Sequence, residues 1–400
     1  MGAMKRSLSK GALGLCLGAA VVCQLARAAD DITGAGSSAA APAYRIWGQE
    51  YQKAGGEALA YEPIGSGAGM ARIKQRQADF GASDVIAPKA ALAKDGLVMF
   101  PTVVSGIVPV VNLRKGGAPL KLSGEVLARI FLGEISHWQA PEIVALNPGL
   151  SLPNEPIRVV CRSDVSGTTH HFSDYLNKVS PAWKARFGVV GRPAWPAGFI
   201  AVKGSSEVSR AVRSTLGAIG YIDYGYVVED ALTAAQLAAA NGRYVGASPA
   251  SFRNAVVSSR WFTHGDFSDS LTQMPGEGAW PITMGTYAVV PKVAGEPERA
   301  ARTLRFFLWA YDHGDALARP HEVYQQLLAA SRTSLLQQQY GEMAARTVAA
   351  NDFVLGALYN GPDTQGRYSE PFMRAIDRAM SLRPKDRPAT VQAFAQELGL

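Results

Sequence analysis

Short apolar runs alternate with helical patterns along most of the chain from Ile32 onward. The runs have the length of buried strands, and between them apolar residues recur every three or four positions, as on one face of a helix. This alternation predicts an α/β chain with largely parallel sheets. The clearest predicted strands are Val103–Asn112, Ile157–Cys161, Ile219–Ile222 and Tyr287–Val290.

Helices are predicted between these strands. The predicted helices are Ala43–Ala54, Gly124–Phe131, Thr168–Val179 and Pro297–Tyr311. In the last of them Ala301, Leu304 and Leu308 fall at helical spacing. We expect this helix to end at His313-Gly314, because glycine is an ordinary stop signal after the last turn.

The first 28 residues have the pattern of a cleavable export signal. Three basic residues precede the charge-free apolar stretch Ala12–Cys23, which is too short to span a bilayer. Ala26-Arg27-Ala28 then matches the small-x-small pattern of a cleavage site. We therefore expect residues 1–28 to be a signal peptide and the mature chain to begin at Ala29; the alternative is a retained membrane anchor.

Removal of this signal changes what charge and cysteine content indicate. The formal net charge of the 400-residue chain is +7, but residues 1–28 carry four basic and no acidic residues, so the remainder carries +3. That small excess does not indicate nucleic-acid binding. Of the three cysteines only Cys161 lies in the mature part, so no intramolecular disulfide can form. The mature part is long enough for two ordinary domains with their own cores.

Three segments each combine a strand, a short Gly/Ser loop and a helix start. Such a loop aims backbone N–H groups and hydroxyls at one point near the positive end of a helix, which holds an anion without a metal. One loop alone is more often a plain turn and cap. Three of them, together with an Arg and an Asp, favour an anion site. The loops are Thr33–Ser38, Ile64–Gly69 and Arg162–Thr168.

These loops and the blocks around them resemble the phosphate-binding proteins of bacterial phosphate ABC transporters. The resemblance runs from about Ile32 to about Thr347 and rests on the order and spacing of many blocks. The blocks are Thr33-Gly34-Ala35-Gly36, Ile64-Gly65-Ser66, Asp79–Asp84, Phe100–Val103, Arg162–Thr168, Gly217–Tyr221 and Trp280–Thr283.

The resemblance implies a type II periplasmic binding-protein fold, in which two α/β lobes joined by hinge strands close over a dehydrated anion. Chain continuity places residues 29–108 and 286–347 in lobe 1 and residues 109–285 in lobe 2. The crossings between the lobes are expected near Pro109 and near Thr286.

The family's binding residues can be carried over position by position. Arg162 would offer a planar fork of donors to two phosphate oxygens, and Asp164 would orient Arg162. Asp84 would accept the proton that phosphate itself carries. The implied phosphate-binding set is Ser38, the backbone at Ala39, Ser66, Asp84, Arg162, Ser166, Gly167 and Thr168.

One departure from the family lies in the first loop. This chain has Ser38-Ala39 where the family commonly has Thr-Phe, which keeps the hydroxyl and loses a bulky residue near the cleft mouth. Because the run Ser37–Ala41 contains no large side chain, we expect water to be less well excluded there.

The implied function is capture of inorganic phosphate in the periplasm and its delivery to the permease subunits of an ABC importer. The protein is then expected to be a monomer that needs no cofactor, metal or nucleic acid and is not an enzyme. The alternative is a phosphoester-binding, phosphatase-like or phosphate-sensing protein that uses the same cleft. His170-His171 suggests a metal site and Ser166 with His170 a hydrolase pair, but neither has the further ligand or orienting acid it needs.

The last segment, residues 348–400, differs from the rest. Asp352–Tyr359 and Ala379–Pro388 resemble the closing helices of a bacterial Ser/Thr protein-kinase domain. The segment lacks every ATP-binding and catalytic motif of a kinase, so it is interpreted as a helical tail without activity.

We predict that this tail is dispensable for binding, because every residue of the implied set lies between Ser38 and Thr168. A chain that ends after Ala350 should bind phosphate with the affinity of the full chain in isothermal titration. A truncated protein that folds but no longer binds would place the tail within the binding unit.

Overall fold

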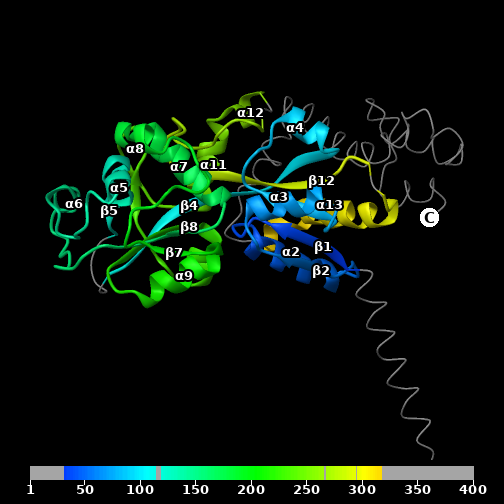
Figure 1. The fold of residues 1–400 in the computed structure, drawn as a ribbon, viewed down its shortest axis with the longest axis horizontal. Helices are drawn as coiled ribbons and strands as arrows, with labels where there is room; N and C mark the ends of the chain where they lie inside the picture. The colour runs from blue at the N-terminus through cyan, green and yellow to red at the C-terminus, as the bar shows by residue number, and fades with distance from the viewer. Residues whose placement is uncertain (1–30, 114–118, 265–266, 294, 318–400) are drawn as a thin grey trace, which may run out of the picture.

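Two α/β lobes lie side by side and share two long strands, β4 (Leu97–Asn112) and β12 (Thr283–Pro291) (Figure 1). The computed structural model describes residues 31–113, 119–264, 267–293 and 295–317. The predicted signal peptide and the predicted helical tail lie outside the described residues, as does the part of lobe 1 beyond residue 317.

The first lobe is a sheet covered by helices on both faces. Its elements are β1 (Ile32–Gly36), α2 (Ala41–Lys53), β2 (Leu59–Glu62), α3 (Ser66–Lys74), β3 (Phe80–Ser83), α4 (Lys89–Lys94) and α13 (Pro297–Leu317). Strand β1 pairs in parallel with β2 and β3, and β12 joins β3 in the antiparallel direction. Tyr44 of α2 and Phe307 of α13 pack edge-on against Phe80 on one face. Ile73 of α3 and Leu97 are buried on the other face.

The second lobe surrounds the other half of β4. Its elements are β5 (Lys121–Leu122), α5 (Gly124–Phe131), α6 (Pro141–Leu146), β6 (Arg158–Arg162), α7 (Gly167–Val179), α8 (Pro181–Arg186), β7 (Ile200–Val202), α9 (Gly204–Ser214), β8 (Ala218–Asp223), α10 (Tyr224–Glu229), β9 (Thr233–Ala234), β10 (Gln236–Ala238), β11 (Tyr244–Val245), α11 (Pro249–Val257) and α12 (Arg260–His264). Strand β8 is buried at every position, which explains its unbroken apolar run. Helices α5 and α7 lie on one side of this sheet and α9 on the other (Figure 1).

A single path of paired strands connects the two lobes, in the order β2-β1-β3-β12-β4-β8-β6-β7. Strand β4 pairs with β12 up to Gly106 and with β8 from Ile107 onward. The register between β4 and β12 shifts between Thr286 and Tyr287. The predicted crossings near Pro109 and Thr286, and the lobe boundaries drawn from them, remain predictions.

The predicted strands and helices are confirmed, but the predicted direction of the sheet is only partly right. Strand β6 runs parallel to β7 and β8, as expected. The pairs β3/β12, β12/β4 and β4/β8 are antiparallel. The reason is topological: the chain passes to the second lobe along β4 and returns along β12, so these two neighbouring strands must run in opposite directions.

The expected helix stop at His313-Gly314 is wrong, because α13 continues to Leu317. Gly314 serves a close contact instead. Trp47 Nε1 donates to the Gly314 carbonyl at 2.9 Å, and a Cβ on Gly314 would lie 2.5 Å from that nitrogen. The glycine therefore lets α13 approach α2 rather than ending the helix.

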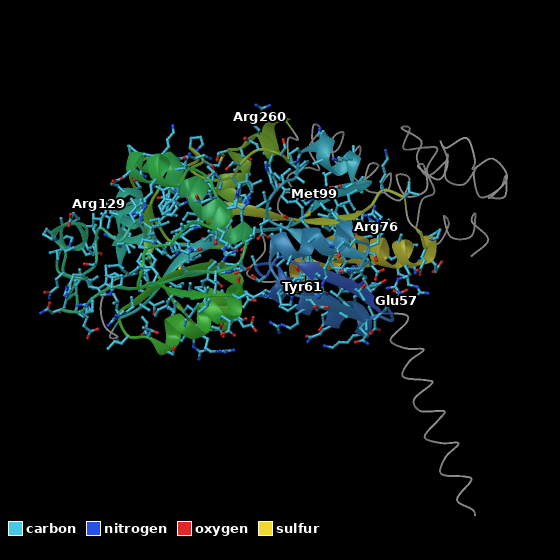
Figure 2. All side chains as sticks on the ribbon, viewed as in Figure 1. Glu57, Tyr61, Arg76, Met99, Arg129 and Arg260 are labelled. Carbon is cyan, nitrogen blue, oxygen red and sulfur yellow. The ribbon has the colours of Figure 1, made fainter. Side chains whose placement is uncertain are left out.

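Most charged side chains of the described residues lie around the outside of both lobes, where many of them pair with opposite charges. Arg129 and Glu57 are on opposite lobes (Figure 2). Arg129 contacts Glu142 at 2.8 Å and Glu57 contacts Arg305 at 3.1 Å. Within the described ranges, no helix has both the length and the apolar character needed to cross a bilayer.

We predict that Gly69→Ala destabilises the first lobe, because α3 packs directly on the backbone of β1. An added Cβ would lie 2.3 Å from Gly36 Cα and 2.6 Å from the Ala35 carbonyl oxygen, so the helix would have to move. The free energy of unfolding, measured with urea, should fall by about 1–3 kcal/mol. Gly246→Ala is the control, because nothing lies within 4 Å of its added Cβ; equal losses in the two variants would contradict the prediction.

Candidate anion-binding site

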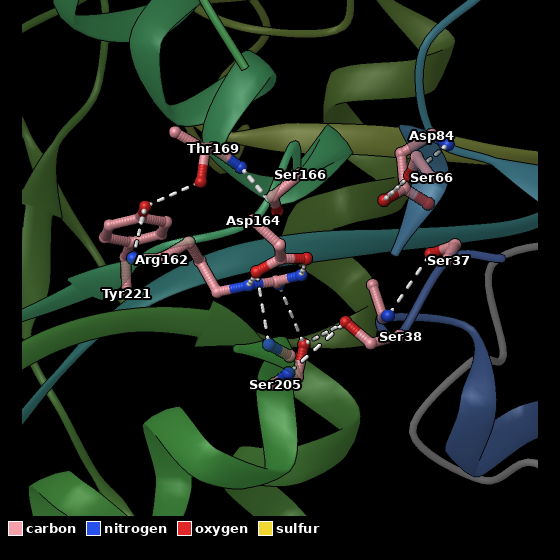
Figure 3. Close-up of polar contacts among 12 residues, drawn as sticks. Ser37, Ser38, Ser66, Asp84, Arg162, Asp164, Ser166, Thr169, Ser205 and Tyr221 are labelled. Carbon is pink, nitrogen blue, oxygen red and sulfur yellow. Dashed lines mark hydrogen bonds and ion pairs between the residues drawn. The ribbon is translucent and has the colours of Figure 1, made fainter. Parts of the chain in front are cut away.

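The three predicted loops meet at the junction of the two lobes (Figure 3). Ser38 lies between β1 and α2, Ser66 is the first residue of α3, and Ser166 is the N-cap of α7. Each loop follows a strand and precedes a helix, as predicted. The positive ends of three helices therefore face a region that two lobes enclose.

Arg162 is the only strongly cationic group of the predicted set, and it is almost completely buried. It ends β6 with 1% of its surface exposed. Asp164 accepts from Arg162 Nε at 2.7 Å and from Nη2 at 2.5 Å, so the predicted orienting contact is present in a bidentate form. Burial raises the pKa of Asp164, but the hydrogen bonds and charge of Arg162 outweigh it and hold that pKa below the ordinary range.

Asp84 lies on the first lobe, directly after β3, whereas Arg162 lies on the second. The side chain of Asp84 is buried, with 1% of the residue's surface exposed. Thr286 donates to Asp84 Oδ1 at 2.6 Å, and Ser66 donates to Oδ2 at 3.2 Å. The Ser66 hydroxyl also accepts the Asp84 N–H at 3.2 Å. Asp84 is thus held in one orientation by hydroxyls from α3 and β12.

The lobes touch directly around these residues. The Gly67 N–H donates to the Val165 carbonyl at 3.4 Å. A Cβ on Gly167 would lie 2.5 Å from Asp84 Cβ and 2.6 Å from Ser66 Oγ, so only glycine permits this approach. The predicted residues of the first and second lobes are therefore brought together.

The start of α7 presents further hydroxyls, those of Ser166 and Thr168. Ser166 Oγ accepts the Thr169 N–H at 3.2 Å, which caps α7 and leaves the hydroxyl proton available. Thr168 Oγ1 is buried and has no hydrogen-bond partner among the described residues. A buried hydroxyl without a partner is costly, so its position indicates a polar ligand.

The loop Ser37–Ala40 is almost completely buried. Its residues are between 0 and 3% exposed, whereas the next residue, Ala41, is half-buried. The expectation that water is less well excluded along Ser37–Ala41 remains a prediction. Tyr61 donates to the Ser37 carbonyl at 2.6 Å and Tyr226 of α10 donates to the Ser38 carbonyl at 3.1 Å. Tyrosines from distant parts of the chain thus cover a loop that has no large side chain of its own. The Ala39 N–H, predicted to face the anion, donates here to Ser37 Oγ at 3.2 Å.

Ser205 is a site residue that the sequence analysis missed. It lies near the start of α9, is 1% exposed, and its Oγ is 2.9 Å from Ser38 Oγ (Figure 3). The preceding N–H, that of Gly204, donates to Asp164 Oδ1 at 3.2 Å. Strand β7, the run Lys203-Gly204-Ser205-Ser206 and the start of α9 repeat the strand, Gly/Ser loop and helix start of the other three loops. This repetition was the sequence signal that could have identified Ser205.

His171 connects the two lobes, next to His170 on α7. His171 Nε2 lies 2.6 Å from the Asp84 carbonyl oxygen, so it joins α7 to the first lobe. Burial, together with the nearby charge of His171, lowers the pKa of His170 to about 4. Within the described ranges, no three His, Cys, Asp or Glu residues gather in a way that could hold a metal ion.

Asp223, at the end of β8, is a second buried carboxyl near Asp84. Its Oδ1 accepts the Gly225 N–H at 2.8 Å, and the hydroxyl of Ser105 also interacts with this carboxyl. Burial raises the pKa of Asp223 to about 7, and the charge of Asp84 contributes in the same direction. Asp223 is therefore partly protonated near neutral pH.

The chain is similar to known proteins in both sequence and fold. The PBP superfamily domain matches residues 23–308. The phosphate-binding protein PstS of Xylella fastidiosa is 40% identical over 288 residues, which cover 72% of this chain and 79% of that protein. The PstS of Haemophilus influenzae is 39% identical over 317 residues, 77% of this chain and 95% of that protein. A phosphate-bound, high-affinity periplasmic phosphate-binding protein has a similar fold, with a TM-score of 0.57 and 20% identity over 77% of this chain and 95% of that one.

We predict that Asp223→Asn changes how stability depends on pH. Between about pH 4 and pH 7 Asp223 keeps its proton in the folded protein, whereas the same side chain in the unfolded chain has released it. The contribution of Asp223 to the free energy of unfolding is therefore complete below this window and is lost as the pH rises through 7. Asparagine cannot lose that proton. The variant's stability relative to the parent should therefore rise by about 2 kcal/mol from pH 5 to pH 8 in urea unfolding; a difference that does not change with pH would contradict this.

Proposed function

Because the chain belongs to the phosphate-binding protein family of the PBP superfamily, we propose that it binds inorganic phosphate in the periplasm and delivers it to the permease subunits of a phosphate ABC importer. The observation that carries this proposal is the buried guanidinium of Arg162, held by Asp164 where the N-termini of α2, α3, α7 and α9 meet between two lobes. The binding residues proposed are those implied by the family: Ser38, Ala39 through its backbone, Ser66, Asp84, Arg162, Ser166, Gly167 and Thr168, with Asp164 as the orienting residue.

The charges of the site favour an anion that carries a proton. Asp164 balances the charge of Arg162, so the donors left for a ligand are mostly neutral N–H groups and hydroxyls with the partial charges of the helix ends. Asp84 adds a carboxylate, which would repel an anion at short range unless a hydrogen lies between them. Phosphate near neutral pH supplies that hydrogen and sulfate does not.

Binding is proposed to proceed by closure of the lobes. Four members of the set, Ser38, Ala39, Ser66 and Asp84, lie on the first lobe, and the other four lie on the second. An anion that accepts hydrogen bonds from residues of both lobes stabilises the closed arrangement, because only in that arrangement do all the donors point at one centre. Ser66 would turn its hydroxyl from Asp84 toward the ligand or offer the backbone N–H at the start of α3.

Inorganic phosphate fits this arrangement better than a phosphoester. The lobes are in contact beside the site, through Gly67 with Val165 and through His171 with Asp84, which favours a small ligand without an organic group. Burial raises the pKa of the Cys161 thiol to about 12, so this residue is not a nucleophile. We propose a monomeric binding protein that performs no chemistry on its ligand, with lobes bounded as residues 29–108 and 286–347, and residues 109–285.

We predict that Asp84 makes the site select phosphate over sulfate. The mature chain should bind phosphate in isothermal titration, while sulfate and a phosphoester should fail to compete. In Asp84→Asn the side chain keeps its shape but gains N–H donors, so the repulsion of sulfate is removed and discrimination between the two anions should fall by about tenfold or more.

Two results would contradict this assignment. Equal affinities of the parent for sulfate and phosphate would remove the proposed function. An unchanged affinity ratio in Asp84→Asn would leave phosphate binding intact but remove Asp84 as the selecting residue. Arg162→Ala is the control for an inactivated site, since it deletes the cationic donor and leaves Asp164 buried without its partner.

A further inference from the structure

Ser205 connects two members of the proposed binding set that belong to different lobes. Its Oγ is 2.9 Å from Ser38 Oγ, and its N–H donates to the same Ser38 oxygen at 3.3 Å. Arg162 Nη1 donates to Ser205 Oγ at 3.5 Å. Ser38 lies on the first lobe, whereas Ser205 and Arg162 lie on the second, so these contacts require closed lobes (Figure 3).

We propose that Ser205 is a positioning residue of the phosphate site, which turns the Ser38 hydroxyl toward the anion and prolongs the closed state. This inference rests on the proposed function and deepens it. The sequence analysis did not assign Ser205 to the site, and its side chain acts through Ser38 and Arg162.

Counting hydrogen bonds explains the orientation. A serine hydroxyl offers one donor and two acceptor positions. Ser38 Oγ accepts the Ser205 N–H, and when it also accepts the Ser205 hydroxyl both of its acceptor positions are filled. The Ser38 proton is then left for another acceptor, and a phosphate oxygen is one. Serine has no β-branch to restrict its rotation, so without this contact the Ser38 hydroxyl would be less well ordered.

The charge of Arg162 favours the same direction of donation. A donor chain from Arg162 through Ser205 to Ser38 begins at a cation and would end at an anion, so each hydrogen bond polarises the next. The opposite direction would point the Ser38 proton at Ser205 and its lone pairs at the ligand. An anion between the lobes therefore selects the orientation in which Ser38 donates.

The backbone of Ser205 adds a signal that can be measured. Ser205 lies in the first turn of α9, where N–H groups have no partner within the helix. Its N–H is instead bonded to Ser38 Oγ across the lobe junction. Protection of this one amide from hydrogen exchange should therefore report closure of the lobes.

The first experiment compares phosphate binding by the parent and by Ser205→Ala, with Ser206→Ala as the matched control because that side chain is exposed. The dissociation rate of phosphate, followed by tryptophan fluorescence in stopped flow, should rise about tenfold in Ser205→Ala. The association rate should stay within about twofold, because Ser38 and Ser205 meet only after the ligand has entered. A dissociation rate equal to that of the parent would overturn the inference.

The second experiment asks whether Ser205 acts through Ser38. Phosphate affinity is measured for Ser38→Ala, Ser205→Ala and the double variant. If Ser205 positions Ser38, the double variant should bind no more than about twofold more weakly than Ser38→Ala alone. Effects that multiply independently would overturn the positioning role.

The third experiment needs no substitution at Ser205 and so does not depend on the folding of that variant. In the parent, saturating phosphate should slow amide exchange at Ser205 by about tenfold or more, and in Ser38→Ala this slowing should be absent. No slowing in a parent that binds phosphate would overturn the inference alone. A parent that binds no phosphate would instead overturn the proposed function on which the inference rests.

Discussion

The buried ion pair between Arg162 and Asp164 is the interaction on which the site depends. Burial of a guanidinium costs several kcal/mol unless a partner compensates its charge and its hydrogen bonds. Asp164 compensates both, with bonds to Nε and Nη2, and it also accepts the Gly204 N–H at the start of α9. One carboxylate therefore fixes the cation at the end of β6 and joins it to the neighbouring β7–α9 loop.

The remaining polar groups are arranged so that few of them carry a full charge. Four helix starts contribute N–H groups and hydroxyls, while Asp84 is held by Thr286 and Ser66. Neutral donors discriminate anions by where hydrogens lie rather than by total charge.

The strands and helices could be predicted from local pattern because burial imposes a period of two or of about 3.6 residues. The direction of pairing could not, because β4 and β12 are neighbours through a long intervening segment rather than through local sequence. Gly314 shows the same limit. The sequence pattern identified it as a helix stop, whereas contact with Trp47, 267 residues away, decided its role.

For the site, the sequence by itself determined three loops with anion-binding chemistry, together with Arg162 and its orienting partner Asp164. Loop conformation and donor type depend on residues close together in the chain, so they can be inferred from it. Only the tertiary structure decided that Ser205 lies beside Ser38, 167 residues away, and that Tyr226 covers the loop that contains Ser38. These contacts form where the two lobes meet, and no local period or motif encodes which residues face each other across such a junction.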